Sequence, residues 1–133
     1  MGTRVLLVED NEVFRRPLQR ALEAAGYAVV AVSSGEDALA SLDGSRVELV
    51  LTDQHLPRMG GIALVARIKA RQPAVKVIVM TADATSESAV EAGRSGADDY
   101  LVKPFEMPEL LHALHRTLEP QKSPTRAARS EAL

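Results

Sequence analysis

The chain has 133 residues, of which 46% are apolar and 26% are charged, and its formal net charge is −2. This length is enough for one domain with its own hydrophobic core, and a net charge near zero gives no electrostatic reason to expect binding to nucleic acid or to a membrane surface. The lack of cysteine excludes disulfides, zinc sites made of thiolates and cysteine nucleophiles.

The first apolar run, residues 5–8, meets two acidic residues directly and is too short for a signal peptide. No stretch of the sequence approaches the roughly 20 apolar residues that a membrane-spanning helix needs. We therefore expect a cytoplasmic protein.

Short segments rich in β-branched residues are predicted to be strands, and segments with helical periodicity separate them. Apart from Glu48 and Lys76, the strand segments are continuously apolar rather than alternating, which is typical of a parallel sheet covered by helices on both faces. In chain order the expected strands cover residues 5–8, 27–32, 47–51, 75–80 and 100–102. Five helices are expected between and after these strands. The first, third and fifth contain the apolar stripes of residues 14–25, 62–68 and 107–118. The second begins at a capping box in residues 33–36, and the fourth covers residues 85–94.

Two of these helices have unusual features. Pro17 lies inside the first stripe, where it removes a backbone donor, so this helix either starts near Arg16 or is kinked. The segment 85–94 has Val90 as its single sizeable apolar residue, and we expect it to be a mobile element. Glycine follows three of the expected helices, at the position where a left-handed C-cap favours it: Gly26, Gly44 and Gly96.

The alternation of strand and helix occurs five times. Parallel strands joined by right-handed crossovers make a doubly wound α/β fold, here a (βα)5 three-layer sandwich with the expected sheet order 2-1-3-4-5. We expect this domain to occupy residues 1–118. Residues 119–133 contain two prolines and no large apolar residue before Leu133, which indicates a flexible tail or a linker.

Charged and hydroxyl side chains follow the expected strands. Glu9 and Asp10 follow the first strand, Asp53 the third, Thr81 the fourth and Lys103 the fifth. In open parallel sheets ligands bind beyond the carboxyl ends of the strands, at the point where the strand order reverses. With the order 2-1-3-4-5, Asp10 and Asp53 face each other, and Thr81 and Lys103 flank the same pocket.

Three carboxylates in contact raise one another's pKa unless a cation lies among them. A site made of oxygen atoms favours a hard ion, and Mg²⁺ suits a small open site that keeps several waters. A bound Mg²⁺ would attract a phosphoryl group, whose other oxygens Lys103 and Thr81 could hold. One of the carboxylates could then act as a nucleophile.

These residues lie within a longer set of motifs that occur in order at strand ends. The set is Glu9-Asp10, Asp53 followed by Leu56-Pro57 and Gly60-Gly61, Thr81-Ala82, and Tyr100 three residues before Lys103-Pro104. Over residues 3–118 the chain therefore resembles the receiver domain of two-component response regulators, which implies a flavodoxin-like fold.

The resemblance implies a role for each site residue. Asp53 would be the phosphoacceptor, which attacks a phosphohistidine and forms an acyl phosphate. Mg²⁺, for which Mn²⁺ can substitute, would be held by Asp10, Asp53 and the backbone carbonyl of His55, and by Glu9 through water. The implied phosphoryl-binding residues are Thr81, Ala82 and Lys103; the implied switch residues are Thr81 and Tyr100; and the implied residues that tune dephosphorylation are His55 and Asp83.

The resemblance also implies partners. A sensor histidine kinase or a phosphotransfer protein would dock near the first helix and the Pro104-Phe105 loop, where Pro17 could alter the choice of partner. The fourth helix, fifth strand and fifth helix would form the output surface that controls a downstream effector protein or domain, with a phosphorylation-dependent homodimer as an option. We expect no direct binding to nucleic acid by this domain, no membrane contact, and no enzymatic activity beyond its own phosphotransfer and autodephosphorylation. The chain would act alone or precede an effector domain.

Several alternatives remain open at this point. An aspartate-nucleophile phosphohydrolase of the haloacid dehalogenase type would carry D-x-D-x-T after its first strand, whereas Asp53-Gln54-His55 follows the third and lacks the second aspartate. A flavin mononucleotide binder would need a Ser/Thr/Gly-rich loop in place of Glu9-Asp10, and a receiver-like domain that is not phosphorylated is a further option. Simpler interpretations also exist: Asp10 as a helix cap, Tyr100 as a core residue, and His112 with His115 as an exposed helix face instead of a metal site.

Overall fold

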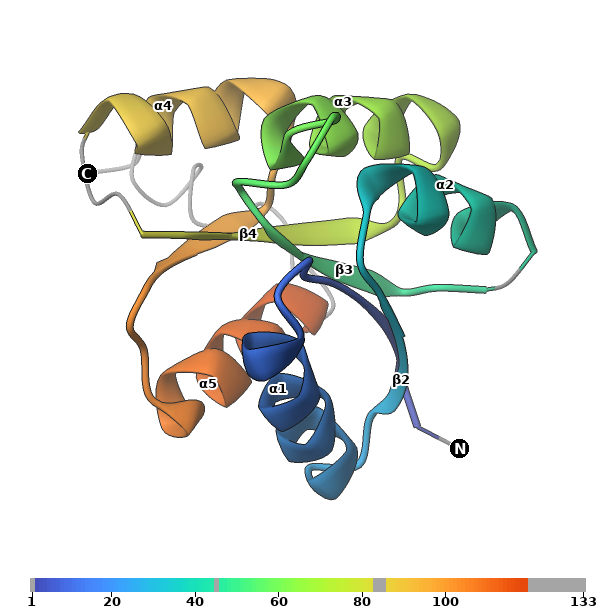
Figure 1. The fold of residues 1–133 in the computed structure, drawn as a ribbon, viewed down its shortest axis with the longest axis vertical. Coiled ribbons are helices and arrows are strands. Elements are labelled where there is room, and N and C mark those ends of the chain that lie inside the picture. Colours follow the sequence, from blue (N-terminus) through green and yellow to red (C-terminus); the bar gives the residue numbers. More distant parts are fainter. Residues whose placement is uncertain (1, 45, 83–85, 120–133) are drawn as a thin grey trace, which may run out of the picture.

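The computed structural model describes residues 2–44, 46–82 and 86–119, with the backbone alone for residues 86–89 and 92 (Figure 1). Five strands alternate with five helices along this part of the chain. In chain order the elements are β1 (Arg4–Val8), α1 (Glu12–Ala24), β2 (Ala28–Val32), α2 (Gly35–Gly44), β3 (Leu49–Asp53), α3 (Gly61–Arg71), β4 (Lys76–Thr81), α4 (Ser86–Ser95), β5 (Asp99–Val102) and α5 (Met107–Leu118).

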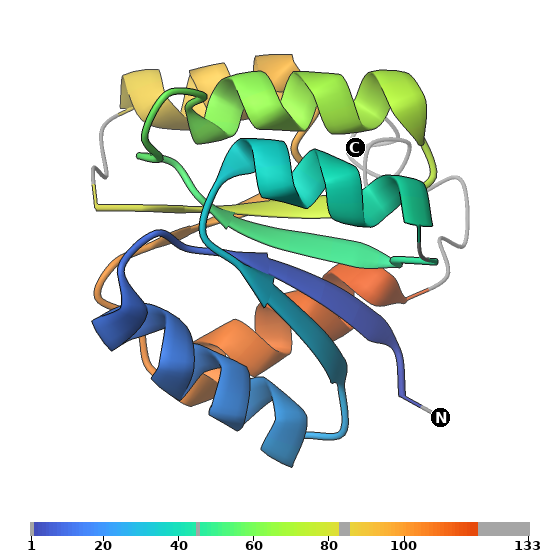
Figure 2. The ribbon, with the colours of Figure 1, turned by 45° about the vertical axis from the view of Figure 1, so that its right-hand side comes forward.

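The strands form one parallel sheet in the order β2-β1-β3-β4-β5. Helices α2, α3 and α4 cover one face of the sheet, and α1 and α5 cover the other, so that the molecule has three layers (Figures 1 and 2). The doubly wound α/β fold and its strand order are therefore confirmed. Because the chain leaves β1 toward one edge and returns to β3 on the other side, the order reverses between β1 and β3.

Alternate residues of each central strand pack into two separate cores. In β1, Leu6 and Val8 face α2 and α3, whereas Val5 and Leu7 face α1 and α5. Strands β3 and β4 follow the same alternation and are buried along almost their whole length, which explains the continuous apolar runs of residues 49–51 and 77–80. The central strands thus form a rigid base for the residues at their carboxyl ends.

Two strands extend further than their apolar runs predict. Thr52 and Asp53 belong to β3, because Thr52 pairs with Val8 and Asp53 pairs with Met80. Thr81 belongs to β4 and pairs with Val102. These polar residues therefore have fixed strand geometry instead of lying in loops after the strands.

Helix α1 begins at Glu12, so of the two alternatives left open by Pro17, a start near Arg16 is excluded. Asn11 caps the helix, its Oδ1 accepting a hydrogen bond from the Val13 N–H at 2.9 Å, and Asp10 is not the cap. Pro17 lies inside the helix, where its missing N–H leaves the carbonyl of Val13 without the usual helical bond. The Val13 side chain is exposed, so that water can reach this first turn.

Other helix ends differ from expectation by about one residue. The Ser34 hydroxyl, and not that of Ser33, caps α2 by accepting a hydrogen bond from the Asp37 N–H at 3.1 Å. Gly26 and Gly96 have the expected left-handed conformation, with φ of 101° and 105°. Gly44 is the last residue of α2. None of the described helices is long and apolar enough to cross a membrane.

Candidate functional site

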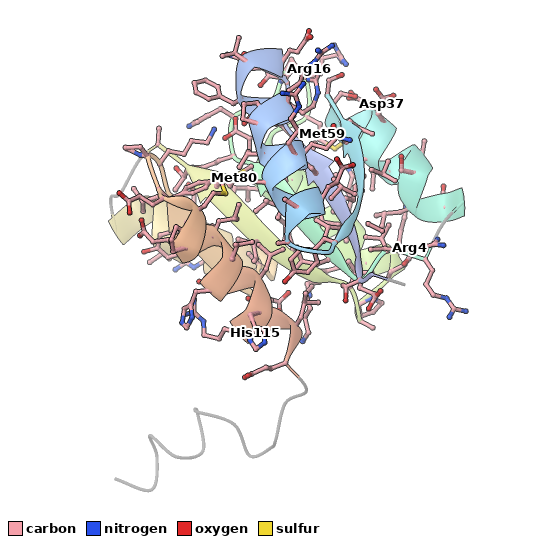
Figure 3. All side chains as sticks on the ribbon, turned by 90° about the horizontal axis from the view of Figure 1, so that it is seen from below. Arg4, Arg16, Asp37, Met59, Met80 and His115 are labelled. Carbon is pink, nitrogen blue, oxygen red and sulfur yellow. The ribbon has the colours of Figure 1, made fainter. Side chains whose placement is uncertain are left out.

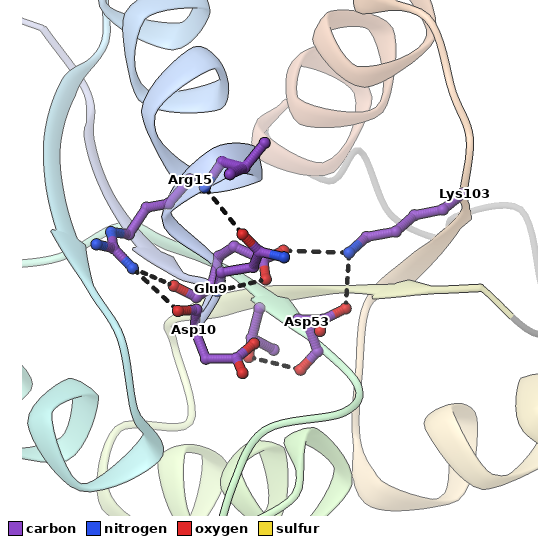
Figure 4. A network of polar contacts seen from close by, with 8 residues as sticks. Glu9, Asp10, Arg15, Asp53 and Lys103 are labelled. Atoms are coloured by element: carbon purple, nitrogen blue, oxygen red, sulfur yellow. Dashed lines mark hydrogen bonds and ion pairs between the residues drawn. The ribbon is translucent and has the colours of Figure 1, made fainter.

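Three carboxylates meet at the carboxyl edge of the sheet, where β1 and β3 lie side by side (Figure 4). Glu9 follows β1 and is 1% exposed, and Asp53 ends β3 and is 8% exposed. Asp10 is exposed. One oxygen atom from each of the three carboxylates lies within 4.8 Å of the others. The acidic cluster predicted from the strand ends is therefore formed.

Lys103 reaches the same cluster from β5. Its Nζ lies 3.1 Å from Glu9 Oε1 and 3.0 Å from Asp53 Oδ1. The Lys103 N–H donates to the carbonyl oxygen of Thr81 at 2.7 Å, which fixes the backbone from which the side chain extends. The ammonium group also lies 5.5 Å from the centre of the Phe14 ring, within the distance of a cation–π contact.

Burial and neighbouring charges shift the pKa values of Glu9 and Lys103. Burial raises the pKa of the Glu9 carboxyl, and repulsion from Asp53 adds to this, against the hydrogen bonds from the Asn11 N–H and from Lys103. Burial by itself would lower the pKa of Lys103, but the hydrogen bonds to Asp53 and Glu9 raise it above its usual value. One ammonium thus faces three carboxylates, and the negative charge that remains favours a further cation.

The donor set fits a hard divalent ion. Carboxylate oxygens are the ligands that Mg²⁺ prefers, and an exposed carboxylate such as Asp10 leaves room for the waters that this ion keeps. Glu9, Asp10 and Asp53 form the one group of three or more potential metal-ligating side chains among the described residues. His55, whose backbone carbonyl is the fourth predicted ligand, lies exposed in the loop after β3.

The loop of residues 54–60, between β3 and α3, folds tightly back onto Asp53. The Gly61 N–H donates to the carbonyl oxygen of Gln54 at 2.8 Å. A Cβ atom at Gly61 would lie 2.3 Å from the carbonyl oxygen of Asp53, so that glycine is required by close backbone approach. Arg58 has a φ of 66°, and its guanidinium pairs with Glu36 on α2.

The predicted switch and tuning residues are only partly gathered at the site. Thr81 is buried at the end of β4 and pairs with Val102 of β5, its carbonyl oxygen accepts a hydrogen bond from the N–H of Lys103, which follows β5, and Ala82 follows Thr81. The side chain of Tyr100 is 37% exposed on β5, so the alternative of a core residue does not fit. Asp83 lies outside the described residues.

The histidines of α5 belong to an exposed face. His115 lies near the C-terminal end of the helix (Figure 3), and its Nδ1 is 3.8 Å from Glu119 Oε2, with both side chains largely exposed. His112 is also exposed. This supports the interpretation of His112 and His115 as a solvated helix surface.

The sequence did not predict two contacts of α1 with the site. Phe14 was expected in the buried stripe, but it is 55% exposed, and the buried residues of α1 are Leu18 and Leu22. Phe14 instead covers Lys103. Arg15 Nη1 donates to the backbone carbonyl of Glu9 at 2.9 Å and to that of Asp10 at 3.4 Å. Periodicity cannot reveal either contact, because both depend on how the first turn of α1 overhangs the end of β1.

Comparisons with known proteins agree on one family. The chain matches the family described as response regulator receiver domain over residues 5–115. It is 44% identical to the response regulator protein FleR of Pseudomonas aeruginosa over 116 residues, which are 87% of this chain and 24% of that protein. The chain therefore spans about a quarter of the length of the curated relatives it matches.

Solved structures agree with this match. The chemotaxis response regulator CheY4 of Vibrio cholerae superposes with a TM-score of 0.84 at 29% identity, covering 89% of this chain and all of that one. The receiver domain of the sensor histidine kinase PA1611 from Pseudomonas aeruginosa superposes with a TM-score of 0.82 at 33% identity, covering 90% of this chain and all of that one. That structure has a magnesium ion coordinated in its active-site cleft.

Proposed function

Because this chain belongs to the response regulator receiver domain family, we propose that Asp53 is the residue that accepts the phosphoryl group in two-component signalling. The observation that carries this assignment is the position of Asp53: its carboxylate is nearly buried, lies 3.0 Å from the Lys103 ammonium, and has the Glu9 and Asp10 carboxylates beside it. The donor would be a sensor histidine kinase or a phosphotransfer protein. The family is one of signalling domains, and nothing in this geometry favours a phosphohydrolase acting on free substrates.

In the proposed reaction an Asp53 carboxylate oxygen attacks the phosphorus of a phosphohistidine. An O–P bond forms, the P–N bond breaks, and the histidine nitrogen leaves with the electron pair. Lys103, which now pairs with Asp53, would bind an oxygen of the transferred group, and the backbone N–H of Ala82 and the Thr81 hydroxyl would bind the others.

Mg²⁺ would be held by the carboxylates of Asp10 and Asp53 and the carbonyl of His55, and by Glu9 through water, and Mn²⁺ would substitute for it. Bound there, the ion would supply positive charge to the phosphoryl oxygens. Glu9 and Asp10 would orient it, and Lys103 would exchange its bond with Asp53 for one with the phosphoryl group.

The proposed output is a shift between two conformations. New bonds from Thr81 and Lys103 to the phosphoryl group would favour one of them, and Tyr100 would turn inward with Thr81. The surface of α4, β5 and α5 would then bind the effector or a second copy of the chain. His55 and Asp83 would set the rate of autodephosphorylation.

The remaining assignments concern the boundaries and setting of the domain. We propose that the receiver domain occupies residues 1–118 and that residues 119–133 form a flexible tail or linker. A cytoplasmic location and control of a downstream effector protein or domain are predictions of the same kind. The relatives are about four times as long as this chain, which is consistent with action through a further domain in those proteins.

Phosphorylation by a small donor tests the assignment of Asp53. With acetyl phosphate and Mg²⁺, intact-mass spectrometry should show the gain of one phosphoryl group, and chelation of the metal should prevent it. Asp53→Ala should abolish the gain. Asp43→Asn is the matched control, since Asp43 is an exposed carboxylate on α2 that pairs with Arg71, and it should be phosphorylated normally. Phosphorylation of Asp53→Ala at the normal level would contradict the assignment.

A further inference from the structure

Arg15 contacts the backbone of the acidic cluster, and the proposed reaction gives this residue no role. It lies in the first turn of α1, and its side chain runs back to the turn between β1 and the helix (Figure 4). Nη1 donates to the carbonyl oxygen of Glu9 at 2.9 Å and, more weakly, to that of Asp10 at 3.4 Å. Both carbonyls belong to residues whose side chains are proposed to hold the metal.

Several other polar groups of this turn have local partners. The Glu9 N–H donates to the carbonyl of Val32 at 3.1 Å, and the Asn11 N–H donates to Glu9 Oε2 at 3.2 Å. The Asn11 side chain caps α1. The Glu9 carbonyl is partly buried and accepts from Arg15, so the guanidinium completes the hydrogen bonding of the strand-to-helix turn.

Arg15 and Lys103 approach the cluster from opposite sides and act on different atoms (Figure 4). Lys103 bonds to the carboxylate oxygens of Glu9 and Asp53, which are the atoms that a metal would need. Arg15 bonds to backbone oxygens of Glu9 and Asp10 and leaves the carboxylate oxygens available. Both bonds come from Nη1, which the planar guanidinium holds in a fixed orientation, whereas the donors of a lysine ammonium rotate freely at the end of a flexible stem.

We propose that Arg15 is a positioning residue of the metal site, which holds the backbone of Glu9 and Asp10 so that their carboxylates converge on one cation. This inference rests on the metal site proposed above. Residues that orient metal ligands typically change metal affinity by about 10- to 100-fold when they are replaced.

The sign of the effect separates positioning from simple electrostatics. Removal of a positive charge near three carboxylates should by itself strengthen the binding of a divalent cation. If Arg15 positions the ligands, Arg15→Gln should instead weaken binding by about tenfold. Arg16→Gln is the matched control, since Arg16 is the next residue of α1, pairs with Glu12 at 2.9 Å and is exposed; it removes the same charge and should leave the affinity unchanged or slightly higher.

The probe is Mn²⁺ titrated into the full chain and followed by electron paramagnetic resonance of the free ion, with Mg²⁺ as a competitor. Arg15→Lys keeps the charge and should bind Mn²⁺ less tightly than the unchanged protein but more tightly than Arg15→Gln. Equal or tighter binding by Arg15→Gln, or an equal loss in Arg16→Gln, would overturn the proposal. If Arg15→Gln does not fold, Arg15→Lys decides: wild-type affinity in that variant rejects a positioning role.

Measurement of Mn²⁺ binding and phosphorylation in the unchanged protein distinguishes a wrong role for Arg15 from a wrong proposed function. If the unchanged protein binds no Mn²⁺, the metal assignment itself is wrong and the role of Arg15 is rejected with it. If the unchanged protein binds Mn²⁺ and accepts a phosphoryl group while the Arg15 variants bind equally well, the positioning role alone is rejected.

Discussion

Each of the two loops that carry the site has an arginine beside it, but the two arginines make different contacts. In the turn after β1, the half-buried Arg15 donates to the backbone of the two acidic residues. In the loop after β3, Arg58 points outward to Glu36, and both side chains are exposed. Ion pairs between exposed side chains contribute little to stability. The loop after β3 must therefore be held by something else, and the close contact of Gly61 with Asp53 is the feature that does so.

This comparison shows two solutions to the same problem. A metal or phosphoryl site needs its backbone held closely, because small displacements of ligands are costly. After β1 a long side chain supplies the restraint from outside the turn. After β3 the backbone restrains itself, since the lack of a side chain at Gly61 lets the start of α3 pack directly on the end of the strand.

The largest expected effect is that of Gly61→Ala. The added Cβ would lie 2.3 Å from the Asp53 carbonyl oxygen and 2.8 Å from Gln54 Cα, so the loop must move, at a cost of about 1–3 kcal/mol in unfolding free energy. The same movement should slow phosphorylation of Asp53 by acetyl phosphate. Urea unfolding and mass spectrometry measure the two effects.

Gly60→Ala is the control for that variant. Its Cβ would meet nothing nearer than the Gln54 carbonyl oxygen at 3.8 Å, and its φ of −65° suits any residue. We expect a loss of a few tenths of a kcal/mol, because alanine is a poorer helix cap than glycine. Equal losses in the two variants would show that the close approach of Gly61 does not restrain the loop.

Asp10→Asn should separate stability from metal binding. Asp10 is the exposed member of the three-carboxylate cluster, and loss of its charge relieves repulsion, so the metal-free protein should gain about 1 kcal/mol of unfolding free energy. If Asp10 is a ligand, Mg²⁺ should raise the melting temperature of the unchanged protein but not that of the variant. Melting curves with Mg²⁺ and with a chelator test both effects, and an unaltered response to Mg²⁺ would remove Asp10 from the metal ligands.

The smallest effect on the site is expected from Arg58. Its φ of 66° is unfavourable for a residue with a side chain, so Arg58→Gly should be more stable than Arg58→Ala by about 1 kcal/mol. Both variants lose the contact with Glu36, so that their difference reports the backbone alone. Neither should alter Mn²⁺ affinity; a loss of affinity in both would show that the outer arginine also restrains the site.

Most of the fold could be predicted because the central strands are buried on both faces of the sheet, which requires continuous runs of apolar residues in the sequence. The continuous apolar runs of the central strands and the residues at their carboxyl ends led to Glu9, Asp53 and Lys103, which lie together as expected. Strand ends were placed too early because Thr52 and Thr81 are polar, although strand pairing with their neighbours keeps them in the sheet. A polar residue thus shows where the hydrophobic core ends, but the backbone hydrogen bonds of the strand can continue beyond it.

The contacts of α1 with the site could not be predicted in the same way. Phe14 has the spacing of a buried residue, but it precedes the point at which the helix covers the sheet, and it meets Lys103 instead of the core. The role of Arg15 depends on the angle at which the chain enters the helix. Such contacts arise from the three-dimensional path of a turn, and a periodic pattern in one helix contains no information about that path.

The bond between Glu9 and Lys103 joins residues 94 positions apart. During synthesis on the ribosome, the acidic residues of β1 and β3 emerge long before the lysine that neutralises them. A nascent chain that ends before β5 therefore lacks the ammonium that pairs with Glu9 and Asp53 and that would bind a phosphoryl oxygen in the proposed reaction. In the proposed mechanism, acceptance of a phosphoryl group thus requires a nearly complete domain, and fragments that end before Lys103 should neither accept the phosphoryl group nor compete for it.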